Sequence, residues 1–150
     1  MTAVETQGIP RQLSHVALRV RDLDRAVAFY RDVVGLNLKG RRDQAAFLGI
    51  RPDASHELAL FALPPQAAGP DPEGVGMYHM AWEMASFEEL AALNERLKAR
   101  GANIVGYSDR QCNVMFTDPD GNELEAIWEP PSEEWERLKN SPGGVPQLQR

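Results

Sequence analysis

The chain of 150 residues is about the size of one ordinary domain and is long enough to bury a core without disulfides or a structural metal ion. Hydrophobic residues make up 43% of the chain and charged residues 25%, and no run approaches the roughly 18 apolar residues of a membrane span, so we expect a soluble protein with no membrane partner. The net charge of −6 and the scattered basic residues argue against a nucleic-acid surface, which leaves a small molecule as the expected partner.

Residues 1–12 contain no basic start followed by an apolar stretch, so they are predicted to be an N-terminal extension and not a secretory signal. A cytoplasmic location is therefore expected. Cys112 is the only cysteine, which excludes an internal disulfide framework and a cysteine-rich metal site. Any metal ion would have to be held by histidine and carboxylate side chains.

A strand followed by a helix is predicted at the start of residues 13–63. The segment HVALRV alternates between two faces with period two, as a strand does. Apolar side chains then recur at helical spacing: Leu23, Ala26, Val27 and Tyr30. Gly35 is the usual residue for a left-handed C-terminal cap, so the helix is expected to end near it. Strand-like segments follow at 37–42, 45–49 and 57–63.

The same order of elements is repeated in residues 77–129, which indicates an internal duplication. Aligning His15 with His79 also aligns Leu23 with Phe87. Ser86, with Glu89 three residues later, is a capping box that starts the second helix, and Gly101 is expected to end it. Strand-like segments follow at 103–107, 113–117 and 123–128, and the turn sequence DPDGN joins the last two as a hairpin.

These elements predict an α+β fold of two tandem β-α-β-β-β modules that form a cupped mixed sheet around a metal site. Module one is predicted at 13–63 and module two at 77–129, with the proline- and glycine-rich segment 64–76 as the linker. The tail, residues 130–150, is expected to contain a short helix near 132–140 and then to fray.

Strand alternation predicts which side chains share a face, because residues i and i+2 point the same way. In four of the strands the apolar residues alternate on the face that a helix would cover. The opposite face includes four potential metal ligands: His15, Glu57, His79 and Glu125. Two imidazoles with one or two carboxylates in a concave sheet suit Fe(II), Mn(II), Zn(II) or Ni(II).

Four segments resemble the vicinal oxygen chelate superfamily: LSHVALRVRDLDRAVAFYRDVVGL, SHELALF, MYHMAWEM and FTDPDGNELEAIWE. That superfamily includes glyoxalase I, extradiol (ring-cleaving) dioxygenases, fosfomycin-resistance enzymes and bleomycin-resistance binding proteins. The resemblance implies one divalent metal ion in a cup of paired modules, and often a homodimer. It also implies that His15, His79 and Glu125 are the metal ligands, which leaves open positions for a substrate with two neighbouring oxygens.

The segments are most similar to small catechol 2,3-dioxygenase-like proteins, which implies a ring-cleaving dioxygenase that uses Fe(II) on a catechol-like substrate. Such enzymes usually carry an acid/base histidine ahead of the penultimate strand and a tyrosine within it, and the nearest residues here are Ser108 and Met115. His56 and Tyr107 are candidate substitutes, although strand alternation places His56 out of phase with the cup if Glu57 is in phase.

Two further hypotheses stay open. A glyoxalase-like lyase would use Glu57 as a fourth ligand and as the base that moves a proton next to a carbonyl. A drug-binding protein of the bleomycin-resistance type would have no catalysis, although such proteins typically lack the metal ligands that this chain retains. The candidate substrate-binding residues are Phe61 and Phe116, as apolar walls of the cup, and Arg19, as a partner for an anionic group.

Overall fold

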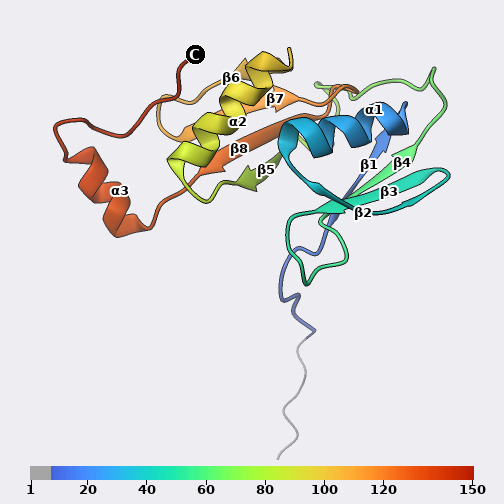
Figure 1. Ribbon diagram of the computed structural model, residues 1–150, viewed down its shortest axis with the longest axis horizontal. Coiled ribbons are helices and arrows are strands. Elements are labelled where there is room, and N and C mark those ends of the chain that lie inside the picture. Colours follow the sequence, from blue (N-terminus) through green and yellow to red (C-terminus); the bar gives the residue numbers. More distant parts are fainter. Residues whose placement is uncertain (1–7) are drawn as a thin grey trace, which may run out of the picture.

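The computed structural model describes residues 8–150, so the first seven residues of the predicted N-terminal extension lie outside the described part. The predicted α+β fold of two tandem modules is confirmed (Figure 1). Each module forms its own four-stranded mixed sheet, and the helices of the two modules contact each other. None of the helices in residues 8–150 is long and apolar enough to cross a membrane.

The first sheet has the strand order β1-β4-β3-β2, with β1 parallel to β4. The elements of this module are β1 (Val16–Val20), α1 (Leu23–Ala28), η1 (Phe29–Val34), β2 (Asn37–Arg42), β3 (Ala45–Gly49) and β4 (Leu58–Ala62). The Asp22 side chain caps α1 by accepting a hydrogen bond from the Arg25 N–H at 2.9 Å. The second half of the predicted helix, η1, is π-helical, and it ends as expected at Gly35, whose φ of 101° favours glycine.

The second sheet repeats this topology, with the order β5-β8-β7-β6 and β5 parallel to β8. Its elements are β5 (Met80–Glu83), α2 (Phe87–Ala99), β6 (Asn103–Gly106), β7 (Cys112–Thr117) and β8 (Glu123–Trp128). The predicted N-cap is confirmed, because the Ser86 hydroxyl accepts a hydrogen bond from the Glu89 N–H at 3.2 Å. The repeated sequence pattern therefore corresponds to a repeated fold.

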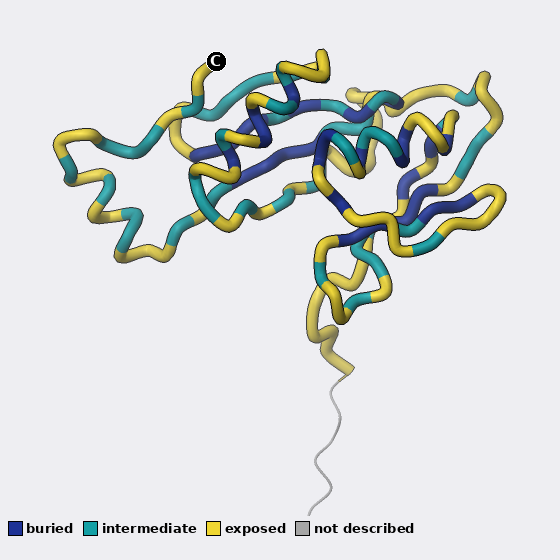
Figure 2. The backbone as a smooth tube through the Cα atoms, in the orientation of Figure 1, coloured by how far each residue is buried: buried dark blue, intermediate teal, exposed yellow. Residues whose placement is uncertain are grey.

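A buried contact fixes the two modules against each other. The Tyr30 hydroxyl at the helix of module one donates to Asp118 Oδ2 in the β7–β8 turn at 2.8 Å. Burial, reinforced by the neighbouring Asp118 carboxylate, raises the pKa of Tyr30 well above its ordinary value. The apolar side chains of both modules join in one core cluster between the helices and the sheets, along the dark segments of Figure 2. The opposite faces of the sheets are not covered by α1 and α2, and we call them the open faces (Figure 1).

The C-terminal tail contains the predicted short helix, α3 (Ser132–Lys139), and the segment after it, which was expected to fray, makes contacts with module two. The buried Asn94 amide of α2 donates to the Gln149 carbonyl at 2.9 Å, and the Cys112 thiol donates to the Pro146 carbonyl at 3.3 Å. Leu148 packs against the core cluster. The tail therefore supplies an acceptor for the buried Asn94 amide of α2.

Candidate active site

His79 and Glu125 lie together on the open face of the second sheet. His79 immediately precedes β5, and the parallel pairing of β5 with β8 sets Ala81 opposite Glu125. The Nε2 atom of His79 lies 3.2 Å from Glu125 Oε2, and its Nδ1 atom lies 4.0 Å from Glu123 Oε1. Glu125 is only 8% exposed. The structure therefore brings together two of the three predicted ligands, and we call His79, Glu123 and Glu125 the His79 half-site.

His15 lies elsewhere, next to a different histidine. Its ring centroid is 4.7 Å from that of His56, whose ring also packs 5.0 Å from Phe47. The Nδ1 atom of His56 is 3.0 Å from the Ser55 hydroxyl. Within residues 8–150, no group of three or more His, Cys, Asp or Glu side chains is arranged to hold a metal ion. A single chain thus presents a second, separate part of the site, His15 with His56, which we call the His15 half-site.

The position of His56 corrects the interpretation from strand alternation. The strand β4 begins at Leu58, so His56 and Glu57 precede the regular strand and its alternation does not extend to them. The Val16 N–H donates to the Glu57 carbonyl at 2.9 Å, which holds this segment against the start of β1. His56 therefore reaches the predicted ligand His15.

Glu57 is engaged with the loop that follows β3. Its carboxylate accepts a hydrogen bond from Arg51 Nε at 2.6 Å and another from the Ile50 N–H at 2.9 Å. Its partial burial acts to raise the pKa, but the bonds from Arg51 and the backbone outweigh burial and lower the pKa of Glu57 below its ordinary value. The side chain lies directly over Gly49, where an added Cβ would be 1.9 Å from Glu57 Oε2. The absence of a side chain at Gly49 thus leaves the space that the Glu57 carboxylate occupies.

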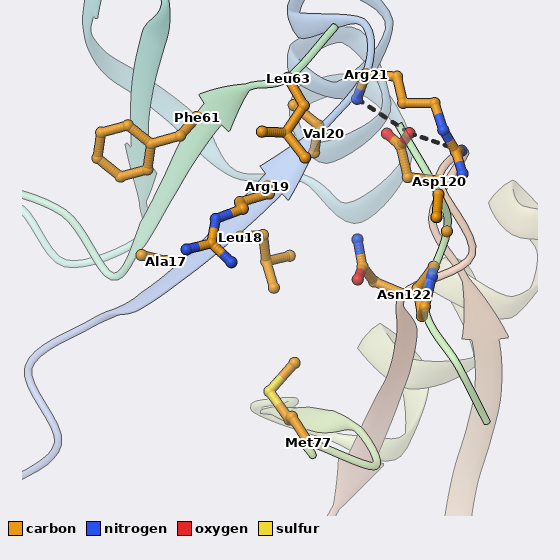
Figure 3. Close-up of a pocket in the computed structure, with 13 residues that line it drawn as sticks. Ala17, Leu18, Arg19, Val20, Arg21, Phe61, Leu63, Met77, Asp120 and Asn122 are labelled. Carbon is orange, nitrogen blue, oxygen red and sulfur yellow. Dashed lines mark hydrogen bonds and ion pairs between the residues drawn. The ribbon is translucent and has the colours of Figure 1, made fainter. Parts of the chain in front are cut away.

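Arg19 and Phe61 line a cavity of about 740 Å³ on the open side of the first sheet (Figure 3). They are direct partners in the β1–β4 pairing, and Phe61 is 44% exposed. Arg19 makes no ion pair with any carboxylate in residues 8–150. The linker, the residue that follows it and the β7–β8 turn supply the other wall: Gly69, Pro70, Met77 and Asn122. This cavity can accept an apolar group with a negative charge at one end.

Phe116 does not line the open face, contrary to the prediction from sequence. It is 0% exposed and packs in the core, with its ring centroid 6.3 Å from that of Phe29. In β7 the apolar residues Cys112 and Val114 share its face, so the alternation places Phe116 beneath the helices.

Asn113, on the other face of β7, was missed by the sequence interpretation. It is 4% exposed, its Nδ2 donates to Glu125 Oε1, and its Oδ1 accepts a hydrogen bond from the Ser108 N–H at 2.8 Å. The alternation of apolar residues in β7 was the signal that could have identified Asn113 as an open-face residue.

Comparison with known proteins places these features in a family context. Residues 12–126 match the model of the Glyoxalase/Bleomycin resistance protein/Dioxygenase superfamily. The chain is 30% identical over 135 residues to a lactoylglutathione lyase of Arabidopsis thaliana, covering 83% of this chain and 46% of that protein. It is 29% identical over 128 residues to a catechol-2,3-dioxygenase of Bacillus subtilis, covering 83% of this chain and 44% of that protein.

The fold is also found in a solved structure, the glyoxylase/bleomycin resistance protein/dioxygenase domain from Frankia sp. EAN1pec. The two are 26% identical with a TM-score of 0.67, and the match covers 81% of this chain and all of that domain. By contrast, the chain spans a little under half the length of each of the two curated relatives described above.

Proposed function

Because the chain belongs to the glyoxalase/bleomycin resistance protein/dioxygenase superfamily, we propose that it is a metal-dependent enzyme that opens the ring of a catechol-like substrate with dioxygen. The observation that carries this proposal is the contact between His56 and His15, with ring centroids 4.7 Å apart. Similarity to a catechol-2,3-dioxygenase supports the same reaction class.

The residues present fit one divalent metal ion, held by His15, His79 and Glu125. Two imidazoles and one carboxylate form a donor set that suits Fe(II), the ion we favour, as well as Mn(II), Ni(II) or Zn(II). His79 Nδ1 and Glu123 Oε1 are both buried without a hydrogen-bond partner in the described residues. A histidine that binds a metal through Nε2 commonly donates its other N–H to a carboxylate, and these two atoms are disposed for that bond. When bound, the ion would supply a Lewis acid for two neighbouring substrate oxygens.

The triad is proposed to be completed by a second copy of the chain. The His15 half-site and the His79 half-site do not meet within residues 8–150, and a homodimer in which they face each other would bring the three ligands together. Large apolar side chains that stand exposed next to both half-sites in the sequence support this arrangement: Leu13 at 81%, Met77 at 52% and Tyr78 at 74%. Their burial between two copies would be favourable.

His56 is proposed as the group that accepts a proton from the substrate. A catechol hydroxyl must lose a proton before its ring is opened, and the imidazole of His56, which packs beside His15, is a suitable acceptor. Glu57 is a weaker base, because its ion pair with Arg51 lowers its pKa. Phe61, whose ring centroid is 6.4 Å from that of Phe47 beside His56, would contact the substrate ring. Arg19 would bind an anionic substituent that extends into the cavity, which none of the proposed ligands lines.

A glyoxalase-like lyase is the second candidate, favoured by the similarity to a lactoylglutathione lyase. In that reaction Glu57 would serve as a ligand or as the base. The carboxylate would first have to leave Arg51 Nε, which it contacts at 2.6 Å. The structure therefore supports this reaction less well than ring cleavage.

The two candidates are separated by their substrates. Protein reconstituted with Fe(II) is assayed for oxygen uptake with a panel of catechols, and reconstituted with Ni(II) or Zn(II) for turnover of the hemithioacetal of methylglyoxal and glutathione. We expect oxygen uptake with at least one catechol, and its loss in His79→Ala. Hemithioacetal turnover without oxygen uptake would establish the second candidate instead. Turnover of neither substrate by protein that binds metal would overturn both.

A further inference from the structure

We propose that Asn113 is a positioning residue that holds the Glu125 carboxylate in the orientation needed to bind the metal ion. The inference rests on the metal site proposed above. It adds to that site a residue from β7, a strand that supplies none of the proposed ligands.

The contacts of Asn113 fix which end of its amide faces Glu125. The Ser108 N–H donates to Asn113 Oδ1 at 2.8 Å, so the oxygen end is occupied by a donor. The Nδ2 end must then face Glu125, to which it donates a hydrogen bond. Because Asn113 is only 4% exposed, water has little access to compete for either bond.

The register of the sheet explains why Asn113 can reach Glu125. The β7–β8 pairing sets Met115 opposite Glu125 and Asn113 opposite Ile127, so Asn113 is the diagonal neighbour of Glu125 on the open face. Asn113 therefore approaches one carboxylate oxygen from the side, while the other oxygen, Oε2, faces His79 Nε2 at 3.2 Å.

The chemistry of an amide suits this position. A glutamate side chain has several rotatable bonds, and a hydrogen bond to one oxygen restricts the rotation that would turn the other oxygen away from His79. A neutral donor also leaves the negative charge of Glu125 available for a cation, whereas lysine or arginine at the same place would neutralise it. Asn113 would thus orient the ligand without competing with the metal.

A purely structural role is the alternative, since Asn113 also accepts the Ser108 N–H and so anchors the β6–β7 loop. The test replaces Asn113 with Leu, which has a similar volume and no polar atoms, and with Asp, which keeps the acceptor for Ser108 and removes the donor to Glu125. The Asp variant also serves if the Leu variant fails to fold. Asn103→Leu is the matched control, because Asn103 donates to Thr117 Oγ1 at 3.0 Å within the same sheet but does not contact Glu125.

The probe is Co(II), whose visible absorption reports the ligand geometry and whose dissociation constant is measured by titration. We expect Asn113→Leu to weaken Co(II) binding by roughly 10- to 100-fold and to change the Co(II) spectrum, with Asn113→Asp changing the spectrum as well. The control variant should match the wild type in both measurements. A loss of thermal stability alone, with the wild-type spectrum and affinity in both Asn113 variants, would overturn the inference.

The Co(II) titration, taken together with the assay for catechol cleavage, separates this inference from the proposed function. Wild-type protein that binds Co(II) with the expected dependence on Asn113, but cleaves no catechol, would overturn the proposed reaction and leave the positioning role standing. Cleavage of catechol by the wild type, with Co(II) binding that does not depend on Asn113, would overturn the positioning role and leave the proposed reaction standing. A wild-type protein that does not bind Co(II) would overturn both.

Discussion

The imidazole of His56 packs against that of His15, with ring centroids 4.7 Å apart, although 40 residues of module one separate them in sequence. The pairing of β1 with β4 brings the two histidines together, since His15 directly precedes β1 and His56 lies just ahead of β4. The same pairing leaves the neighbouring Glu57 turned toward Arg51. One segment thus carries an imidazole that packs beside His15 and a carboxylate that is ion-paired with Arg51, and this difference favours His56 as the base.

Replacing His56 with Gln is expected to lower kcat for catechol cleavage by roughly 10²- to 10⁴-fold, because a general base contributes about that much. Metal content should stay at the wild-type level, since His56 is not a proposed ligand. The measurement is steady-state oxygen uptake together with metal analysis. Glu57→Gln is the matched control and should keep most of the activity. The reverse pattern, with Glu57→Gln inactive and His56→Gln active, would contradict the assignment of the base.

Two inactive variants are expected to complement each other if the site is shared between two copies. His15→Ala and His79→Ala are co-expressed with different tags, and the mixed dimer is purified through both tags. One of its two sites then keeps His15 from one copy and His79 from the other, so about half of the wild-type oxygen uptake per dimer should return. Each variant alone should be inactive. A mixed dimer without activity would show that each site is built within one chain.

Arg19→Leu is expected to raise KM for catechols that carry a carboxylate on the order of tenfold, because a charge-assisted hydrogen bond is lost. The KM for unsubstituted catechol should change little, which makes that substrate the internal control. Steady-state kinetics with the two substrates gives both values. An equal change in KM for the carboxylated and the unsubstituted catechol would indicate that Arg19 does not bind the anionic substituent.

Tyr30→Phe is expected to lower the free energy of unfolding at pH 7 by about 1–3 kcal/mol, because the buried hydrogen bond to the Asp118 carboxylate is lost. The raised pKa of Tyr30 means that the folded state keeps the phenol proton to a higher pH than the unfolded state. This contribution is fully present below the ordinary tyrosine pKa of about 10 and is lost as the pH rises toward the folded-state pKa.

The difference in stability between wild type and Tyr30→Phe should therefore shrink above about pH 10. Denaturant unfolding at pH 7 and at alkaline pH measures it. A difference in stability that grows with pH would contradict this prediction, because it would mean that folding lowers the pKa of Tyr30.

Much of this fold could be predicted because local signals agree with the global topology. Ser86 with Glu89 starts α2 as the capping box indicates, and Gly35 ends η1 with a positive φ. The phase of β5 and β8 also predicted that His79 and Glu125 share a face, because both lie at paired strands with alternating apolar residues. These are properties of single strands and helices, which can be predicted directly from the local sequence pattern.

The remaining features depend on relationships that no single segment specifies. His56 was placed out of phase with the cup, on the condition that Glu57 is in phase, because alternation was extended beyond the first residue of β4, Leu58. Asn113 was missed because its contact with Glu125 is diagonal across two strands. The separation of His15 from His79 depends on how the modules pack, which the buried Tyr30–Asp118 contact helps to fix.

Ring cleavage by this protein can be followed by supplying labelled dioxygen to Fe(II)-reconstituted protein and a catechol, and analysing the product by mass spectrometry. We expect a ring-opened product that carries both labelled oxygen atoms, formed by the wild type and not by His79→Ala. Metal-bound protein that forms no labelled product with any catechol of the panel would contradict the proposed ring cleavage.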